Sequence, residues 1–251
     1  EELGAENIAA FIAEPVLASG GCIVPPDGYF KKIYDVCKKN EIIFIADEVV
    51  TGFGRLGHFF SSEEIFGVVP DIITCAKGIT SGYLPLGAVL FSNKLIADLK
   101  EDSSLFFHGY TYSGHPACCA AALKNIEILK RDKILEHVKE IEPYFFEKLN
   151  TLYELPIVGD IRGKGLMAGI ECVINKDSKE ALVLDKAIGS RIDEESIKLG
   201  LIIRPLYHIC VLSPALIINK EQINELTEKL YQAISNTIDQ LKIEGLWSQN
   251  K

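Results

Sequence analysis

The stretch that decides the fold is Ile42-Ile-Phe-Ile-Ala-Asp-Glu48, together with its counterpart Asp71-Ile-Ile-Thr-Cys-Ala-Lys77. Each contains a short, continuous apolar run of the kind typical of a buried strand in an α/β sheet. Each run also ends in side chains that carry charge, Asp47 with Glu48 in the first and Lys77 in the second. Because ligands bind at the carboxyl ends of strands in open α/β sheets, we expect Asp47 and Lys77 to lie at a ligand site.

The sequence around these two runs repeats the alternation of strands and helices. Apolar runs predict further strands at 8–13 and 87–91, and helical spacing predicts helices at 28–40 and 117–130. Continuous apolar strands separated by helices indicate a mainly parallel sheet. We assign this sheet to a first domain, residues 1–135.

The second part of the chain, residues 136–251, has a different pattern. Strands are expected within 156–173 and at 201–204 and 209–212, and helices at 132–152 and 179–200. A last helix is predicted by an apolar stripe that must pack against another element, made of Ile223, Leu226, Leu230, Ile234, Ile238 and Leu241. The fold class is therefore α/β, with a partial large domain followed by a small C-terminal α+β domain.

Composition is that of an ordinary globular protein and excludes several function classes. Its 251 residues suffice for one large domain or two smaller ones. A formal charge of −9 argues against a nucleic-acid-binding face, which needs clustered Lys and Arg. No apolar stretch reaches the roughly 18 residues of a membrane span. The start, Glu1-Glu2-Leu3-Gly4, contains neither an initiator Met nor a signal-peptide pattern, so we interpret the chain as a fragment or a processed product.

The cysteines indicate a reducing compartment. There are seven of them and no CxxC pair, so the sequence suggests neither a disulfide framework nor a zinc site. We expect reduced, mostly buried thiols, which fit a cytoplasmic protein.

A lone lysine is usually a solvated surface group. Four motifs between residues 47 and 116 support a functional role for Lys77 instead. They are Asp47-Glu-Val-Val-Thr-Gly-Phe-Gly-Arg55, Pro70-Asp71, Ala76-Lys77-Gly78 and Thr111-Tyr-Ser-Gly-His-Pro116. Together they closely resemble the class III, or omega-type, aminotransferases. The resemblance implies the type I fold of pyridoxal-phosphate-dependent transferases and pyridoxal 5′-phosphate as cofactor. A lysine paired with a distant aspartate is how proteins hold that cofactor. Family members are considerably longer, so the resemblance covers the C-terminal portion of a member.

The resemblance assigns catalytic roles to Lys77 and Asp47. Lys77 matches the lysine that bonds to the cofactor aldehyde and, once released by the substrate amine, carries a proton; a structural lysine is the alternative. Asp47 matches the acid that pairs with the pyridine nitrogen, and a carboxylate after an apolar run does need a cation or donors nearby. Val49 matches the residue that packs on the ring face, although a core valine would look the same. For Glu48, a surface or salt-bridge role is as consistent with the sequence as a role in the site.

Three further residues come from the same resemblance. Thr111 matches a threonine that reaches the cofactor phosphate of a neighbouring subunit, which implies a homodimer with the active site at its interface; helix capping is the alternative. Arg204 matches the small-domain arginine that receives a substrate carboxylate, or else simply faces water. Glu14 matches a glutamate that contacts the cofactor site and pairs with this arginine. We hypothesise a gate: Arg204 turns toward Glu14 when an omega-amino substrate enters, and toward an oxo-acid carboxylate in the other half-reaction.

Three functions remain open from the sequence. The first is an aminotransferase that moves an amino group from an omega-amine or omega-amino acid to a 2-oxo acid of the pyruvate or 2-oxoglutarate type by a ping-pong mechanism. The second is an aminomutase, racemase or decarboxylase on the same fold, since one fold hosts many chemistries. The third is a non-catalytic remnant or partner subunit, because the N-terminal portion of a family member supplies the phosphate loop and a ring-stacking aromatic residue.

Overall fold

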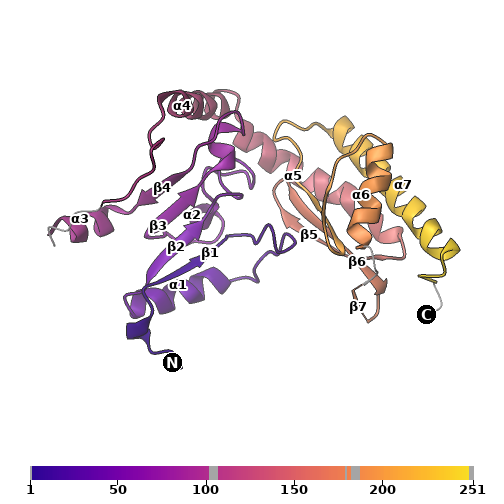
Figure 1. Ribbon diagram of the computed structural model, residues 1–251, viewed down its shortest axis with the longest axis horizontal. Coiled ribbons are helices and arrows are strands. Elements are labelled where there is room, and N and C mark those ends of the chain that lie inside the picture. The colour runs from indigo at the N-terminus through magenta and orange to yellow at the C-terminus, as the bar shows by residue number, and fades with distance from the viewer. Residues whose placement is uncertain (1, 102–106, 179, 182–186, 249–251) are drawn as a thin grey trace. The chain divides into compact units, whose positions relative to one another are not determined.

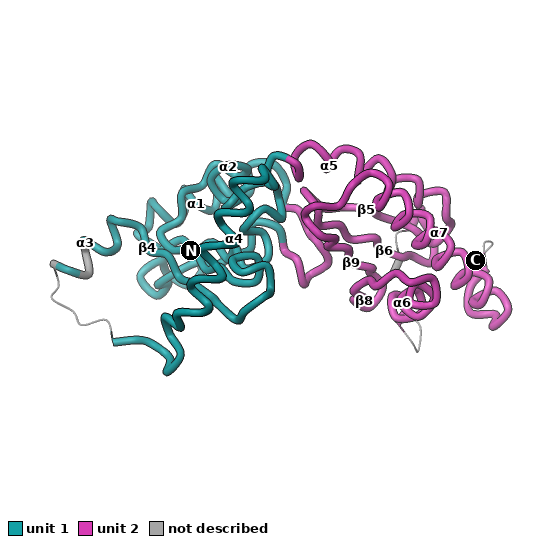
Figure 2. Tube along the Cα trace, turned by 90° about the horizontal axis from the view of Figure 1, so that it is seen from above, with its two compact units in different colours: residues 1–16, 25–136 teal, residues 17–24, 137–251 magenta. Residues whose placement is uncertain are grey.

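The computed structural model describes residues 2–101, 107–178, 180–181 and 187–248 (Figure 1). The chain divides into two compact units (Figure 2). Unit 1 comprises residues 1–16 and 25–136, and unit 2 comprises residues 17–24 and 137–251. Segment 17–24, which the sequence analysis placed in the first domain, therefore belongs to unit 2.

Unit 1 is built on a four-stranded sheet with the strand order β1-β2-β3-β4. The strands are β1 (Ala10–Ala13), β2 (Ile43–Asp47), β3 (Ile72–Cys75) and β4 (Ala88–Phe91). β1, β2 and β3 are parallel, because helices α1 (Tyr29–Lys39) and α2 (Ser61–Glu64) lie in the connections between them. β4 pairs antiparallel with β3 after a connection that holds only the 3₁₀ helix η2 (Lys77–Thr80). The predicted mainly parallel sheet is confirmed, with β4 as an antiparallel edge strand.

The core of unit 1 lies between α1 and one face of this sheet. Phe30 and Cys37 on α1 are buried against Phe44 of β2. The rings of Phe30 and Phe44 meet edge to face with centroids 6.1 Å apart, a favourable geometry for aromatic pairs. On the other face of the sheet, Ile12 and Val89 are 58% and 53% exposed, so this face carries accessible apolar side chains.

Three further elements complete the described part of unit 1. A short 3₁₀ helix, η1 (Ala5–Asn7), precedes β1, and α3 (Asn93–Glu101) follows β4. The predicted helix at 117–130 is α4 (Pro116–Arg131), with Pro116 in its first turn, where a missing N–H costs nothing.

Unit 2 contains an antiparallel sheet with the order β5-β6-β9-β8. Its strands are β5 (Val158–Lys164), β6 (Met167–Asn175), β8 (Arg204–Leu206) and β9 (Ile209–Leu212), and β7 (Glu180–Ala181) pairs with β6. Helices α5 (Ile134–Asn150), α6 (Ile188–Lys198) and α7 (Lys220–Ile243) contribute to the core, with the 3₁₀ helix η3 (Thr151–Glu154) after α5. The predicted stripe on α7 is confirmed: Leu226 is partly buried and the other five residues are buried.

Two element predictions in unit 2 were wrong. The helix expected at 179–200 begins only at Ile188; Glu180–Ala181 form a strand, and residues 179 and 182–186 lie outside the described residues. The strand expected at 201–204 starts at Arg204 instead. Gly200 has φ +75°, and the N–H of Leu201 bonds back to the carbonyl of Ser196 at 2.9 Å. The residues after Gly200 therefore close the end of α6 before the chain extends.

Segment 17–24 packs closely on the sheet of unit 2. A bridge between Leu17 and Ile23 closes the segment into a narrow turn. The Arg162 guanidinium on β5 donates from Nε to the Gly21 carbonyl at 2.9 Å. At Gly169 on β6, a Cβ would lie 2.7 Å from the Gly21 carbonyl oxygen, so only glycine allows this approach.

Six of the seven cysteines are buried and Cys119 is partly exposed, which confirms the expected burial of the thiols. In the part of the chain that the structure describes, each helix is too short or too polar to cross a membrane.

Candidate active site at the carboxyl edge of the parallel strands

Three of the predicted site residues lie at or just beyond the carboxyl ends of three neighbouring parallel strands of unit 1. Ala13, the last residue of β1, pairs with Ala46 of β2, so Glu14 and Asp47 leave the sheet at the same edge. Asp47 pairs with Thr74 of β3, and the chain reaches Lys77 shortly beyond it. The fold therefore brings Glu14, Asp47 and Lys77 to one edge of the sheet, the edge at which ligands bind in open α/β sheets.

Asp47 is half-buried, and its carboxylate is oriented by the backbone that follows. Its Oδ1 accepts a hydrogen bond from the N–H of Val49 at 3.0 Å. A carboxylate has about four lone-pair directions, so this one bond leaves capacity for a cationic partner. Val49, also half-buried, stands directly after the strand end, and its predicted contact with a cofactor ring stays a prediction.

Lys77 is exposed and has a backbone conformation that is rare for a residue other than glycine. Its φ is +40°, and Phe53 and Ser81 of the same unit also have positive φ, at 55° and 50°. Such conformations cost about 1–3 kcal/mol each and cluster at functional sites. Gly78 lies against Phe53: a Cβ on Gly78 would be 2.9 Å from the Phe53 Cβ, so the two strained turns are in contact. The fold thus places Lys77, in a constrained turn, at the same sheet edge as the half-buried Asp47.

Glu48 is not a surface or salt-bridge residue, as the sequence analysis allowed, but a fully buried structural one. Its Oε1 accepts from the N–H groups of Ser61 and Ser62, both at 2.7 Å, and its Oε2 accepts from Thr51 Oγ1 at 2.6 Å. The carboxylate therefore satisfies the first N–H groups of α2, which the side chain of its N-cap residue, Phe60, does not cap.

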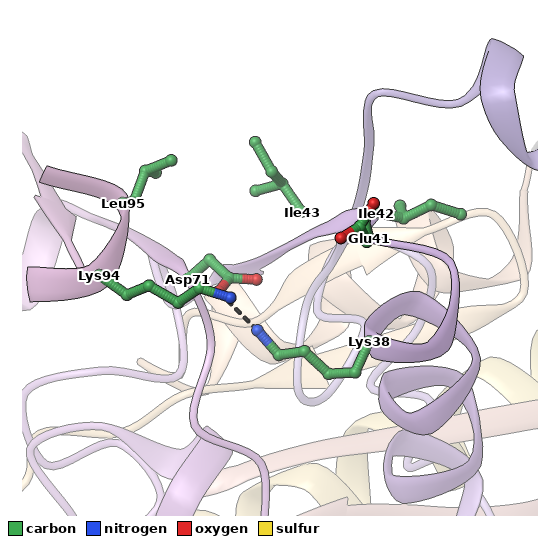
Figure 3. Close-up of a pocket in the computed structure, with 7 residues that line it drawn as sticks. All are labelled: Lys38, Glu41, Ile42, Ile43, Asp71, Lys94 and Leu95. Atoms are coloured by element: carbon green, nitrogen blue, oxygen red, sulfur yellow. Dashed lines mark hydrogen bonds and ion pairs between the residues drawn. The ribbon is translucent and has the colours of Figure 1, made fainter. Parts of the chain in front are cut away.

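Asp71, from the Pro70-Asp71 motif, is likewise structural and lies at the opposite edge of the sheet. Its Oδ2 accepts from the Phe44 N–H at 2.9 Å, and Oδ1 forms an ion pair with Lys38 at 2.5 Å. Burial lowers the pKa of Lys38, but the hydrogen bond to Asp71, the charge of Asp71 and the interaction with Tyr34 together outweigh burial, so the pKa of Lys38 is raised. Figure 3 shows the Lys38 side chain extending toward Asp71 in a cavity of about 270 Å³. This cavity lies at the amino ends of β2 and β3, away from Lys77.

Thr111 belongs to unit 1 and is exposed. It lies in a turn in which the N–H of Tyr110 donates to Ser113 Oγ at 2.9 Å. The alternative that Thr111 caps the following helix is wrong, because α4 begins at Pro116 and its N-cap residue is His115.

Arg204 is exposed at the start of β8 in unit 2, whereas Glu14 belongs to unit 1. The structure therefore gathers Glu14, Asp47, Val49 and Lys77 at one sheet edge of unit 1. Thr111 lies in the same unit and Arg204 in the other, so the hypothesised Arg204–Glu14 gate stays a prediction.

Asn125 on α4 was missed by the sequence analysis. Its side-chain amide bonds to the turn that carries Lys77, with Nδ2 donating to the carbonyls of Gly78 and Ile79. The only local signal is a polar amide inside the alanine-rich run Ala120-Ala-Ala-Leu-Lys-Asn125, where asparagine is a poor helix former.

Comparisons with known proteins identify the family of the chain. The model of the family "Aminotransferase class-III" matches residues 1–234. A putrescine–pyruvate aminotransferase of Pseudomonas aeruginosa is 44% identical over 237 residues, which cover 94% of this chain and 51% of that protein. Gamma aminobutyrate transaminase 3 of Solanum lycopersicum is 42% identical over 251 residues, covering 99% and 48%.

Solved structures confirm the fold. The crystal structure of an (S)-enantioselective omega-transaminase from Thermomicrobium roseum matches with a TM-score of 0.91 and 43% identity, over 95% of this chain and 53% of that one. The chain thus spans about half the length of the relatives it matches. The predicted class, a partial type I fold of pyridoxal-phosphate-dependent transferases, is confirmed. Both the family model and the relatives place the chain, over most of its length, in the class III aminotransferase family.

Proposed function

We propose that this chain carries the catalytic lysine and the ring-nitrogen acid of a pyridoxal-phosphate-dependent aminotransferase. Class III aminotransferases use this cofactor, which supplies an aldehyde for a lysine amine and a ring that withdraws electrons from the substrate carbon. The observation that carries the proposal is the meeting of Glu14, Asp47 and Lys77 at consecutive ends of parallel strands, with Lys77 in a constrained turn. The cofactor requires an amine that bonds to its aldehyde and a carboxylate that pairs with its ring nitrogen, and Lys77 and Asp47 provide these two groups.

Each residue has a defined task in this proposal. Lys77 holds the cofactor and, when its amine is released, moves a proton to and from the substrate carbon. Asp47 keeps the ring nitrogen protonated through a charge-assisted hydrogen bond. Val49 packs on the ring, and Glu14 borders the site. Arg204 receives the carboxylate of the oxo acid and pairs with Glu14 when an omega-amino substrate is bound.

The relatives support an omega-amine or omega-amino acid as donor. Their names give putrescine with pyruvate in one case and gamma-aminobutyrate in the other. We therefore propose transfer from such a donor to pyruvate or 2-oxoglutarate in two half-reactions. Unit 1 would be the C-terminal part of the cofactor-binding domain, and unit 2 the small domain. A cytoplasmic location is proposed from the seven free cysteines.

A labelling experiment on the full-length protein tests the role of Lys77. The protein is incubated with pyridoxal 5′-phosphate, reduced with borohydride and digested, and the labelled lysine is located by mass spectrometry. We expect the label on Lys77 and its loss in Lys77→Ala. Lys133→Ala is the matched control, because Lys133 is also an exposed lysine with positive φ, 52°. Label spread over exposed lysines, or no label with excess cofactor, would instead favour the non-catalytic remnant.

An activity assay separates the remaining functions. With putrescine or 4-aminobutyrate as donor, we expect amino transfer that depends on pyruvate or 2-oxoglutarate. Isomerisation of the donor or release of CO₂ without an oxo acid would favour the aminomutase, racemase or decarboxylase. Arg204→Ala should raise the KM for the oxo acid, and an unchanged KM would count against the role of Arg204.

The homodimer is proposed from the exposed aromatic residues around Thr111. Phe107, Tyr110 and Tyr112 are 94%, 79% and 81% exposed, and exposed apolar groups of this kind mark interaction surfaces. If Thr111 reaches the partner's cofactor, mixing Lys77→Ala with Thr111→Ala subunits should restore activity, because one site of each hybrid dimer is then intact. A lack of restoration, with hybrids shown to form, would mean that Thr111 acts within its own subunit or not at all.

A further inference from the structure

Asn125 joins helix α4 to the turn that carries Lys77. Its Nδ2 lies 2.8 Å from the carbonyl oxygen of Gly78 and 3.1 Å from that of Ile79. Its Oδ1 accepts from Ser81 Oγ at 2.7 Å. A side-chain amide has two N–H groups and one carbonyl. Asn125 therefore uses its NH₂ group and its carbonyl on three residues of one turn, Gly78, Ile79 and Ser81.

The turn depends on contacts from outside itself because its backbone is strained at both ends. Lys77 and Ser81 have φ of +40° and +50°. Within the turn, the N–H of Gly82 donates to the Lys77 carbonyl at 3.2 Å, and Thr80 Oγ1 donates to the Leu84 carbonyl at 2.7 Å. Strained residues persist only where the surroundings over-determine them.

The bonds from Asn125 provide hydrogen-bond donors for the carbonyls of the 3₁₀ helix η2. The last carbonyls of a short helix have few intrahelical partners, and those of Gly78 and Ile79 are the ones that Asn125 binds. On the other side, Gly78 is packed against Phe53 and the Gly52 carbonyl, which a Cβ would approach to 2.9 Å and 3.3 Å. Gly78, the residue after Lys77, is thus held between Phe53 on one side and Asn125 on the other.

We propose that Asn125 is a positioning residue for Lys77: by binding the carbonyls of Gly78 and Ile79, it fixes the left-handed backbone from which the amine reaches the cofactor. The proposal rests on the proposed function of Lys77. Asn125 acts through the backbone, on the two peptide groups that follow the lysine.

The decisive variant is Asn125→Asp, which keeps the shape of the side chain but removes both N–H donors. Asn40→Asp is the matched control, because Asn40 also donates its Nδ2 to a carbonyl, that of Val36 at 2.8 Å, at the end of another helix of unit 1. The first measurement is amide hydrogen exchange of the cofactor-free protein. We expect the amides of Ser81, Gly82 and Tyr83 to exchange roughly tenfold faster in Asn125→Asp, and to be unchanged in Asn40→Asp.

The second measurement is the rate at which Lys77 takes up pyridoxal 5′-phosphate, trapped with borohydride and located by mass spectrometry. We expect the labelling rate to fall roughly tenfold in Asn125→Asp and to stay the same in Asn40→Asp. A reacting group that is displaced by about 1 Å loses that much rate or more. Equal exchange and equal labelling in Asn125→Asp and the unaltered protein would overturn the proposal for Asn125 while leaving Lys77 as the catalytic lysine. If the unaltered protein takes no label on Lys77, the proposed function fails, and hydrogen exchange alone decides whether Asn125 holds the turn.

A variant that fails to fold does not end the test. If Asn125→Asp unfolds, Ser81→Ala removes only the bond to Asn125 Oδ1, and we expect a smaller but local rise in exchange at the same three amides. A rise shared by the amides of β2 would instead mean that Asn125 supports unit 1 as a whole, which would overturn its specific role in placing Lys77.

Discussion

Arg162 donates from Nε to the carbonyl of Gly21 at 2.9 Å, and so joins β5 to a segment 141 residues earlier in the chain. The same guanidinium pairs through Nη1 with Asp160 at 2.7 Å and with Glu171 at 2.5 Å. Although burial lowers the pKa of Arg162, the hydrogen bonds to these two carboxylates raise it above its ordinary value. Segment 17–24, which begins shortly after Glu14, is thus attached to the sheet that carries Arg204.

Replacing Arg162 should release this segment. We expect Arg162→Leu to lower the free energy of unfolding by about 2 kcal/mol, the size of a hydrogen bond to a charged group. The fully buried Cys22 should then react with iodoacetamide faster, as measured by peptide mass spectrometry. Arg131→Leu is the control, because Arg131 is an exposed arginine whose ion pair is with its neighbour in the chain, Asp132. A Cys22 reactivity that stays unchanged in Arg162→Leu would show that other contacts hold the segment.

Glu48 should be a stability residue with no direct part in chemistry. Glu48→Ala leaves the N–H groups of Ser61 and Ser62 and the Thr51 hydroxyl without their acceptor in a buried place. We expect a loss of about 3 kcal/mol in urea unfolding, since each buried unsatisfied group costs about 1–3 kcal/mol. Glu63→Ala, at an exposed position on α2, provides the comparison. A loss no larger than that of Glu63→Ala would contradict the structural role.

Gly78 should tolerate no side chain. In Gly78→Ala the new Cβ would be 2.9 Å from the Phe53 Cβ and 3.3 Å from the Gly52 carbonyl, so the Lys77 turn must shift. We expect a destabilisation of about 1–3 kcal/mol, as for other overpacked sites, and slower labelling of Lys77 by the cofactor. Gly67→Ala is the comparison, because Gly67 has positive φ but open space around its Cβ position. Unchanged labelling in Gly78→Ala would show that the turn is looser than its contacts indicate.

Glu195 should make the stability of unit 2 depend on pH. Hydrogen bonds from Lys198, and then from Gln240 and Asn236, lower the pKa of Glu195 from its ordinary value of 4.5. The folded state therefore holds this proton less tightly than the unfolded chain. The stabilisation is fully present above pH 4.5 and is lost as the pH falls through the lowered pKa of the folded state.

The measurement for Glu195 compares urea unfolding of Glu195→Gln and the unaltered protein at about pH 7 and about pH 3. At the higher pH we expect the unaltered protein to be more stable than Glu195→Gln. At the lower pH we expect this difference in the free energy of unfolding to be smaller. Glu228→Gln, at an exposed position on α7, should show no such trend. A difference between Glu195→Gln and the unaltered protein that is the same at both pH values would contradict the assignment.

Much of unit 1 could be predicted from local pattern. The runs ending at Asp47 and just before Lys77 are strands β2 and β3, and the helices predicted at 28–40 and 117–130 are α1 and α4. The direction of β4 was not predicted, because apolar content is the same for parallel and antiparallel strands. It is decided by the connection after β3, which holds only a short 3₁₀ helix.

The sequence by itself determined which chemical groups end the parallel strands, because a strand of continuous apolar residues stops where a charged side chain must meet solvent or a partner. Only the tertiary structure decided what surrounds those groups: that Glu48 is buried beneath α2, that segment 17–24 belongs to unit 2, and that Asn125 holds the Lys77 turn. The reason is that periodicity and strand ends are local properties of a chain. The partner of a buried carboxylate or amide, in contrast, comes from residues tens of positions away and is selected only when the chain folds.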